Sequence, residues 1–184
     1  MIYFITSNIN KFLEAKAIIP ELEQLSLDLP EVQELDPKLI IEEKLKEAFK
    51  SHSGEFIVED TSLYLDCLNG FPGPLIKWML KSISAEGIFN LVNLHKNNGA
   101  SAKTIVGYSD GKNIFFFEGE IKGKIVAPKG NSGFGWDTIF MPSGFKTFAE
   151  MSKEEKNKIS MRKQAFNQLK EFLDSKNNSN KTTE

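Results

Sequence analysis

The chain has 184 residues, 40% of them hydrophobic and 26% charged, which is typical of one ordinary globular domain that can bury a core. Its formal net charge of −2 argues against a protein that mainly binds the nucleic-acid backbone, because such proteins carry a clear basic excess. The single cysteine, Cys67, excludes an internal disulfide and a zinc site of the cysteine type.

The first half of the chain alternates strands and helices. Residues 1–6 form a continuous apolar run, typical of a buried strand, and residues 7–19 continue with helical spacing of apolar side chains. A second strand is expected over 24–29. A helix then begins at Asp36-Pro37, a cap followed by a first-turn proline, and runs to about residue 49.

The middle of the chain is predicted to contain a long strand and two short helices. Residues 55–65 indicate a strand that leaves the core at the charged pair Glu59-Asp60, and helices are expected over 75–83 and 85–95. Strands over 103–108 and 113–126 flank the turn signal Asp110-Gly111, which predicts a hairpin.

The last part of the chain is predicted to hold a strand over 134–140 and a helix from Ser152, whose capping box pairs with Glu155, to about residue 173. Residues 175–184 lack apolar side chains and are expected to form a disordered tail. The whole pattern predicts the α/β class with a mixed sheet. No run approaches a membrane span and the start lacks a signal-peptide pattern, so we expect a cytoplasmic protein that binds neither membranes nor nucleic acid.

Two polar clusters suggest phosphate and metal binding. In "TSNINK", Thr6, Ser7, Asn8 and Asn10 offer small donors and Lys11 a charge at a helix N-terminus, although a plain helix cap would look the same. This stretch is neither the Walker loop nor the dinucleotide fingerprint. The carboxylates of Glu31, Glu59 and Asp60 are the kind of ligand that Mg²⁺ takes, and their alternative interpretation is a surface acidic group.

Two further clusters suggest a nucleotide. Lys44, Lys77 and Lys156 would each be a solvated surface lysine alone, but together with Lys11 they could offset the charge of a nucleoside triphosphate. "FGWD" and "SMR" supply aromatic faces that could stack a base, with Asp and Arg for its polar edge. The alternative for Trp136 is a core anchor.

The chain resembles the inosine/xanthosine triphosphate pyrophosphatase family. The matching stretches are "TSNINK", "LPEVQ", "VEDTSLYLDCLNGFPGPLIKW", "GKIVAPKGNSGFGWDTIFMPSG" and "TFAEMSKEEKNKISMR". The resemblance implies an elongated mixed α/β fold over residues 1–174, with two lobes, a substrate cleft between them and a homodimeric assembly. It also implies Mg²⁺-dependent hydrolysis, with Mn²⁺ as a substitute, of ITP, dITP and XTP between the α and β phosphates to the monophosphate and pyrophosphate.

The resemblance also implies roles for individual residues. At the phosphates it places Thr6, Ser7, Asn8, Ile9, Asn10 and Lys11, with Thr61, Lys44 and Lys77 on the nucleotide and Lys156 near the phosphates or the base. Glu31 and Asp60 would serve the metal, and Asp60 would also orient or deprotonate the attacking water. Phe134, Gly135, Trp136 and Asp137 would line the base pocket, so that Trp136 becomes a pocket wall, and Met161 and Arg162 would face the base.

One position departs from the family pattern. The family has Ser-His-Arg where this chain has Ser160-Met161-Arg162, and a thioether cannot donate a hydrogen bond. This departure motivates two alternatives, a pyrophosphatase with relaxed or different base preference and a nucleotide-binding protein with impaired catalysis. Two further alternatives are a pyrophosphatase acting on modified pyrimidine triphosphates and an RNA or hairpin binder, which the acidic balance disfavours.

Overall fold

The computed structural model describes residues 1–144 and 146–181. In chain order the elements are β1 (Ile2–Ile5), α1 (Ile9–Lys16), β2 (Glu23–Leu25), α2 (Pro37–Ser51), β3 (Glu55–Leu65), β4 (Pro72–Gly73), α3 (Ile76–His95), β5 (Gly99–Ser109), β6 (Ile114–Ile125), β7 (Phe140–Pro142), α4 (Lys153–Ile159) and α5 (Met161–Lys181), with short 3₁₀ turns at Asp66–Leu68 and Phe148–Glu150. Within these described ranges no helix is long and apolar enough to cross a bilayer.

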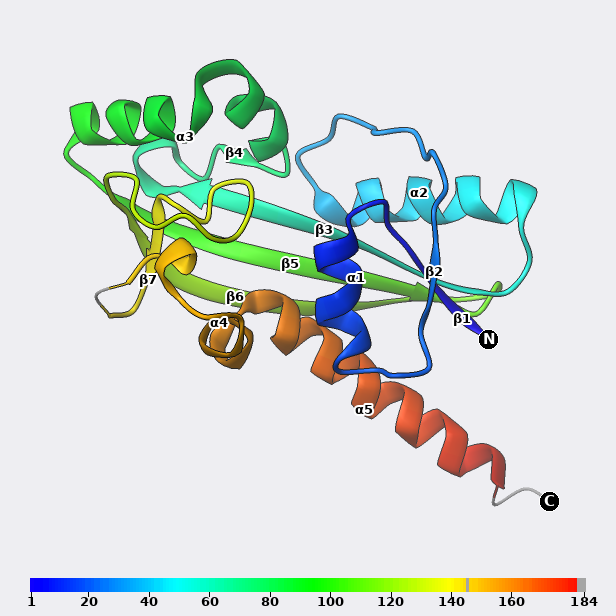
Figure 1. The fold of residues 1–184 in the computed structure, drawn as a ribbon. Helices are drawn as coiled ribbons and strands as arrows, with labels where there is room; N and C mark the ends of the chain where they lie inside the picture. Colours follow the sequence, from blue (N-terminus) through cyan, green and yellow to red (C-terminus); the bar gives the residue numbers. More distant parts are fainter. Residues whose placement is uncertain (145, 182–184) are drawn as a thin grey trace.

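The strands form one seven-stranded mixed sheet in the order β2-β1-β3-β5-β6-β7, with β4 also paired to β3. β1 runs parallel to β2 and β3, whereas β3, β5, β6 and β7 pair antiparallel. The sheet is elongated because β3, β5 and β6 are long (Figure 1). The predicted α/β class with a mixed sheet is therefore confirmed.

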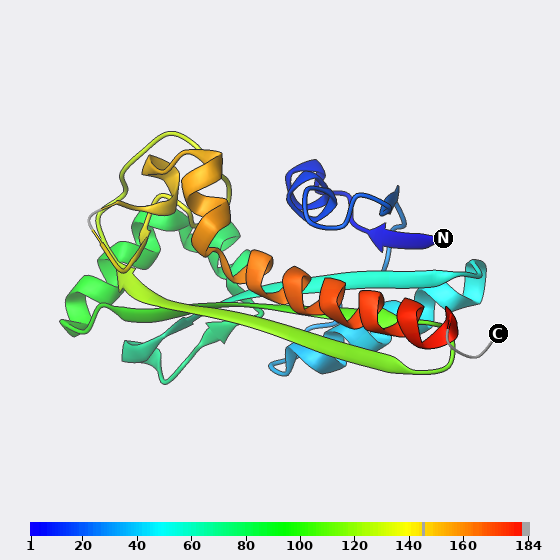
Figure 2. The same ribbon diagram turned by 90° about the horizontal axis from the view of Figure 1, so that it is seen from below.

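Helices cover both faces of the sheet (Figures 1 and 2). α1 and α5 bury Phe12 and Phe166 against Ile57 on one face, and α2 buries Leu45 against Val58 on the other. α3 lies at the far end, where a third cluster includes Trp136 and residues of β3 and β5. Neighbouring residues of β3 alternate between the two faces, as the pleat of a strand requires.

One edge of β3 is interrupted. β5 pairs with β3 from Phe56 to Leu65 along one edge, so β1, paired at Glu55–Ile57, and β4, paired at Leu63 and Tyr64, must share the other edge. Between them residues 58–62 have no strand partner on that side among the described residues. Side chains from both faces of β3 can therefore reach the same opening.

The local signals for helix starts are confirmed. The side chain of Asp36 accepts a hydrogen bond from the Lys38 backbone N–H, and Pro37 opens α2. Ser152 and Glu155 form the predicted capping box of α4. The predicted hairpin also forms, although β5 already begins at Gly99.

Two strand predictions near the pocket are wrong. β2 ends at Leu25 instead of 29, and the chain then runs as a loop to α2. Residues 134–139 form turns instead of a strand, because Gly133 and Gly135 have φ of +83° and +66°, which an extended strand cannot accommodate. Only Phe140 of that stretch belongs to β7.

The prediction that β3 leaves the core at Glu59-Asp60 is also wrong. Glu59 is 6% exposed, and Ser62 and Leu63 are fully buried. The strand stays inside because the charge of Glu59 is compensated by partners that lie far away in the sequence, Arg162 and Lys11.

The C-terminal helix differs from its prediction in two ways. It is broken at Ser160, whose ψ of 145° is extended and whose hydroxyl caps the new helix by accepting from the Lys163 N–H. α5 then continues to Lys181, so residues 175–181 of the predicted disordered tail are helical, and residues 182–184 lie outside the described residues. Lys176 holds this end by ion pairs with Asp110 and Glu55.

Candidate active site

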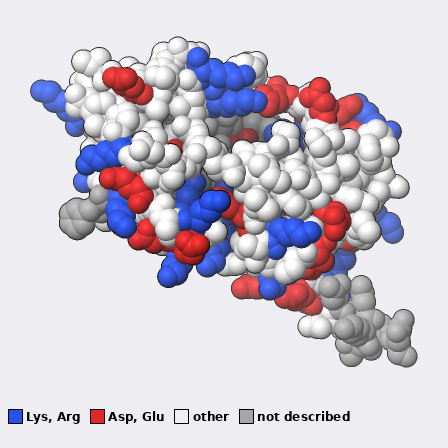
Figure 3. Space-filling model, in the orientation of Figure 1, with Lys and Arg blue, Asp and Glu red and all other residues white. Residues whose placement is uncertain are grey.

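The predicted site residues converge on one cavity of about 580 Å³ that opens along the interrupted edge of β3. Such a volume lies in the usual range for small-molecule sites. The predicted residues that line it are Thr6, Ser7, Asn8, Lys11, Glu31, Lys44, Glu59, Asp60, Thr61, Lys77, Phe134, Gly135, Trp136, Asp137, Lys156, Met161 and Arg162; Ile9 and Asn10 do not line it. The surface is hollowed here, with basic side chains along one side of the opening and acidic side chains along the adjacent side (Figure 3).

The turn between β1 and α1 presents the helix N-terminus to the cavity. Asn8 caps α1 by accepting from the Asn10 and Lys11 backbone N–H groups at 3.0 and 3.4 Å. Thr6 Oγ1 accepts from the Asn8 N–H at 3.1 Å. These bonds shape the turn, and the exposed Ser7 hydroxyl and the N-terminal dipole of α1 remain directed to the opening.

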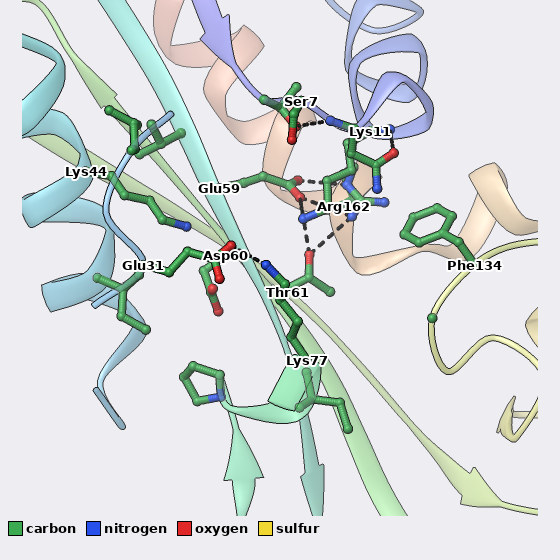
Figure 4. Close-up of a pocket in the computed structure, with 18 of the residues that line it drawn as sticks. Ser7, Lys11, Glu31, Lys44, Glu59, Asp60, Thr61, Lys77, Phe134 and Arg162 are labelled. Carbon is green, nitrogen blue, oxygen red and sulfur yellow. Dashed lines mark hydrogen bonds and ion pairs between the residues drawn. The ribbon is translucent and has the colours of Figure 1, made fainter. Parts of the chain in front are cut away.

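Glu31, Lys44, Asp60 and Lys77 point toward one another from four different segments (Figure 4). Lys77 donates to Glu31, and this hydrogen bond lowers the pKa of the Glu31 carboxyl. Burial raises the pKa of Asp60 and lowers the pKa of Lys44, and the attraction between these two groups opposes both shifts. The group therefore combines two carboxylates and two ammonium ions in a partly dehydrated space.

A second charged group lies on the opposite face of β3. Arg162 donates Nε and Nη2 to the two oxygens of Glu59 at 2.7 and 3.1 Å, Nη1 to Glu14 at 2.6 Å and Nη2 to Thr61 at 3.2 Å. Lys11 pairs with Glu59 at 2.8 Å. Burial would raise the pKa of Glu59, but Arg162 and Lys11 lower it to about 2. These contacts tie α1 and α5 to β3.

The base-pocket stretch forms the remaining wall. Phe134 lies under two cations, Lys156 Nζ at 4.8 Å and the Arg162 guanidinium at 5.8 Å from its ring centre. Asp137 is 4% exposed, pairs with Lys156 at 2.6 Å and accepts from the Phe134 N–H at 2.9 Å. Asp137 thus has the buried partner that its position requires.

Trp136 is both a pocket wall and a core residue. It lines the cavity, yet it is only 6% exposed and packs against Phe140 and Phe148 with ring centres 5.3 and 6.2 Å apart. Met161 likewise lines the cavity but is 2% exposed and belongs to the same apolar cluster. Phe134 is half-buried and therefore more accessible than Trp136.

Sequence reasoning missed other residues of the cavity. Trp78 and Lys81 line it one and four residues after Lys77, a spacing that places Lys77 and Lys81 on one helix face and could have signalled both lysines. Asp28 also lines it, three residues before Glu31, from the loop that was predicted as strand. Glu14 gave no signal of its own, because only the fold brings it to Arg162.

Comparisons with known proteins agree with one another. The model of the Ham1 family matches residues 2–172. The inosine triphosphate pyrophosphatase of Schizosaccharomyces pombe is 40% identical over 96% of this chain and 97% of that protein, and that of Podospora anserina is 44% identical over 92% of both. The Ham1 protein of Staphylococcus aureus superposes over 96% of this chain and 100% of its own, with a TM-score of 0.80 and 26% identity. The dITP/XTP pyrophosphatase of Mycobacterium abscessus gives 0.67 and 27%, over 87% of this chain and 94% of that chain.

Proposed function

Because the chain belongs to the Ham1 family, we propose that it hydrolyses deaminated purine nucleoside triphosphates, ITP, dITP and XTP, to the monophosphate and pyrophosphate. The observation that carries this proposal is the composition of one cavity. Carboxylates and lysines occupy one part of it, and a wall with the Phe134 ring and paired polar groups occupies another. A triphosphate needs the first part and a purine the second.

The acidic residues fit a hydrated divalent cation. Mg²⁺ keeps several waters and takes one or two protein carboxylates together with phosphate oxygens. Glu31 and Asp60 point into the same space, and within the described ranges no set of three or more His, Cys, Asp or Glu residues could hold a metal by protein ligands alone. We propose that these two residues hold Mg²⁺, or Mn²⁺ in its place, and that the phosphates of the substrate complete its coordination. Such an ion would neutralise charge that develops on the phosphates.

The chain's own residues have three tasks in this proposal. Asp60, kept in a partly dehydrated place, orients the attacking water and accepts its proton. Lys44 and Lys77 stabilise negative charge on the leaving pyrophosphate. Ser7, Lys11 and the N-terminus of α1 hold the phosphate chain in line.

Base selection is assigned to the wall formed by Phe134, Asp137, Lys156 and Arg162. Hypoxanthine and xanthine carry an oxygen at position 6 and a proton on N1, whereas adenine carries an amino group and a bare N1, so polar groups matched to the first pair reject adenine. Met161 can add only an apolar contact. A relaxed base preference is therefore the second candidate, and the buried thioether at this position favours it.

The test is a screen of ITP, dITP, XTP, GTP and ATP with Mg²⁺, with the monophosphate and pyrophosphate as measured products. Asp60→Asn should keep its fold and lose about 10²–10⁴-fold in kcat, the usual effect of removing a general base. Asp174→Asn, on the exposed side of α5, is the matched control and should retain wild-type turnover. An Asp60→Asn rate above a tenth of wild type would remove Asp60 from its role.

The proposal also covers domain organisation, oligomeric state and location. We propose a single two-lobed domain, a homodimer and a cytoplasmic location, as the family resemblance implies. Light scattering on the purified protein would test the homodimer, and limited proteolysis would test the single domain.

A further inference from the structure

We infer that Ser62 is a positioning residue that fixes the Asp60 carboxylate for metal and water, an inference that rests on the proposed function. The Ser62 hydroxyl donates to Asp60 Oδ2 at 2.8 Å, and Ser62 is fully buried. The two residues are two apart on β3, so their side chains lie on the same face of the sheet.

Asp60 depends on this contact more than its neighbour does. Glu59 is held from three directions, by two bonds from Arg162, one from Lys11 and one from Thr61. Among the hydrogen bonds and ion pairs of the described residues, the bond from Ser62 is the only one that the Asp60 side chain makes. Without it, the carboxylate could rotate about its terminal torsion, which is broad for aspartate.

The hydrogen bond also gives the two oxygens of the carboxylate different surroundings. Oδ2 accepts the hydrogen bond from Ser62, whereas Oδ1 accepts none among the described residues, and Asp60 lines the cavity. A carboxylate that binds a metal or a water with one oxygen is commonly held through the other by such an outer partner. Ser62 is this outer partner of Asp60.

Ser62 is itself held in place, because it lies within β3 opposite Lys103 of β5 and is fully buried.

The test compares Ser62→Ala, which removes the donor, with Ser62→Thr, which keeps the hydroxyl. Ser62→Cys replaces the hydroxyl by a thiol of similar size that is only a weak hydrogen-bond donor. It takes the place of Ser62→Ala if that variant does not fold. Ser109→Ala, a buried serine of β5 that does not line the cavity, controls for the loss of a buried hydroxyl. Each variant is measured for ITP turnover, for Mn²⁺ binding without nucleotide by the paramagnetic signal of the free ion, and for its melting temperature.

Ser62→Ala should lose about 10- to 100-fold in kcat and in Mn²⁺ affinity, the usual effect of removing an outer partner of a metal ligand, with KM for ITP within about twofold. Ser62→Thr should stay within about threefold of wild type. A folded Ser62→Ala with kcat and Mn²⁺ affinity within about twofold of wild type would overturn the inference. So would equal losses in Ser62→Ala and Ser62→Thr that follow their melting temperatures. If the wild-type protein releases no pyrophosphate, the proposed function fails, and Mn²⁺ binding alone then decides the role of Ser62.

Discussion

Arg162→Met should destabilise the protein strongly without touching the metal group. Met keeps an apolar stem of similar length but removes the guanidinium, which is 2% exposed and makes four hydrogen bonds to Glu59, Glu14 and Thr61. Removing one partner of a buried ion pair costs roughly 3–5 kcal/mol, because the other charge stays buried and uncompensated. At about 2–4 °C per kcal/mol for a chain of this size, the melting temperature should fall by roughly 6–20 °C.

The pH dependence identifies the charge that is left behind. The pKa of Glu59 in the folded protein is about 2, below its ordinary 4.5, so its contribution to stability is fully present above about 4.5 and is lost as pH falls toward 2. Without Arg162 the pKa of Glu59 in the folded variant rises. Glu59 is then protonated at a higher pH than in the wild type, and its protonation removes the uncompensated buried charge. The difference in melting temperature between wild type and Arg162→Met should therefore be largest near pH 7 and narrow below about pH 4.

A double-mutant cycle separates this cause from lost packing. Glu59→Gln combined with Arg162→Met removes both charges and should be less destabilised than the two single changes added together, by roughly 0.5–3 kcal/mol. Lys46→Met, which removes an exposed ion pair with Glu43, should change stability by no more than about 0.5 kcal/mol. A loss below about 1 kcal/mol in Arg162→Met, or strict additivity in the cycle, would refute the reasoning.

The remaining predictions concern the two residues that belong both to the cavity and to the core. Trp136→Ala should lower the free energy of unfolding by roughly 3–5 kcal/mol even without nucleotide, since the ring packs on Phe140 and Phe148; a ligand-free melt close to wild type would contradict this. Met161→His should lower it by about 1–3 kcal/mol, because an imidazole replaces a 2% exposed thioether in an apolar cluster. Its kcat/KM ratio of ITP over GTP should rise a few-fold to about tenfold if the imidazole reaches the base, and an unchanged ratio would place position 161 away from it.

Local signals predicted what local interactions decide. Asp36-Pro37 and the Ser152–Glu155 box begin helices in the structure because caps act within one turn. The strand expected over 134–140 failed for a related reason. Apolar residues there suggested a strand, but the positive φ of Gly133 and Gly135 bends the backbone into turns.

Long-range compensation could not be predicted from spacing. The bond between Glu59 and Arg162 joins residues 103 positions apart, so the sequence pattern alone predicted that the strand leaves the core at Glu59-Asp60. The same is true of Lys176, which holds the end of α5 against Tyr108 and Asp110 where the composition indicated disorder. Family motifs, in contrast, named most of the cavity, since they single out residues that the fold assembles.

The interrupted edge of β3 also links substrate binding to folding. β1 leads into α1 at one end of the gap, and β4 leads into α3 at the other. In the part of the chain that the structure describes, no strand along this edge joins them. A nucleotide held by Ser7 and Lys11 on one side and by Lys77 on the other would contact both ends at once. Bound nucleotide would hold the two ends together reversibly, so the melting temperature of the protein should rise with nucleotide concentration.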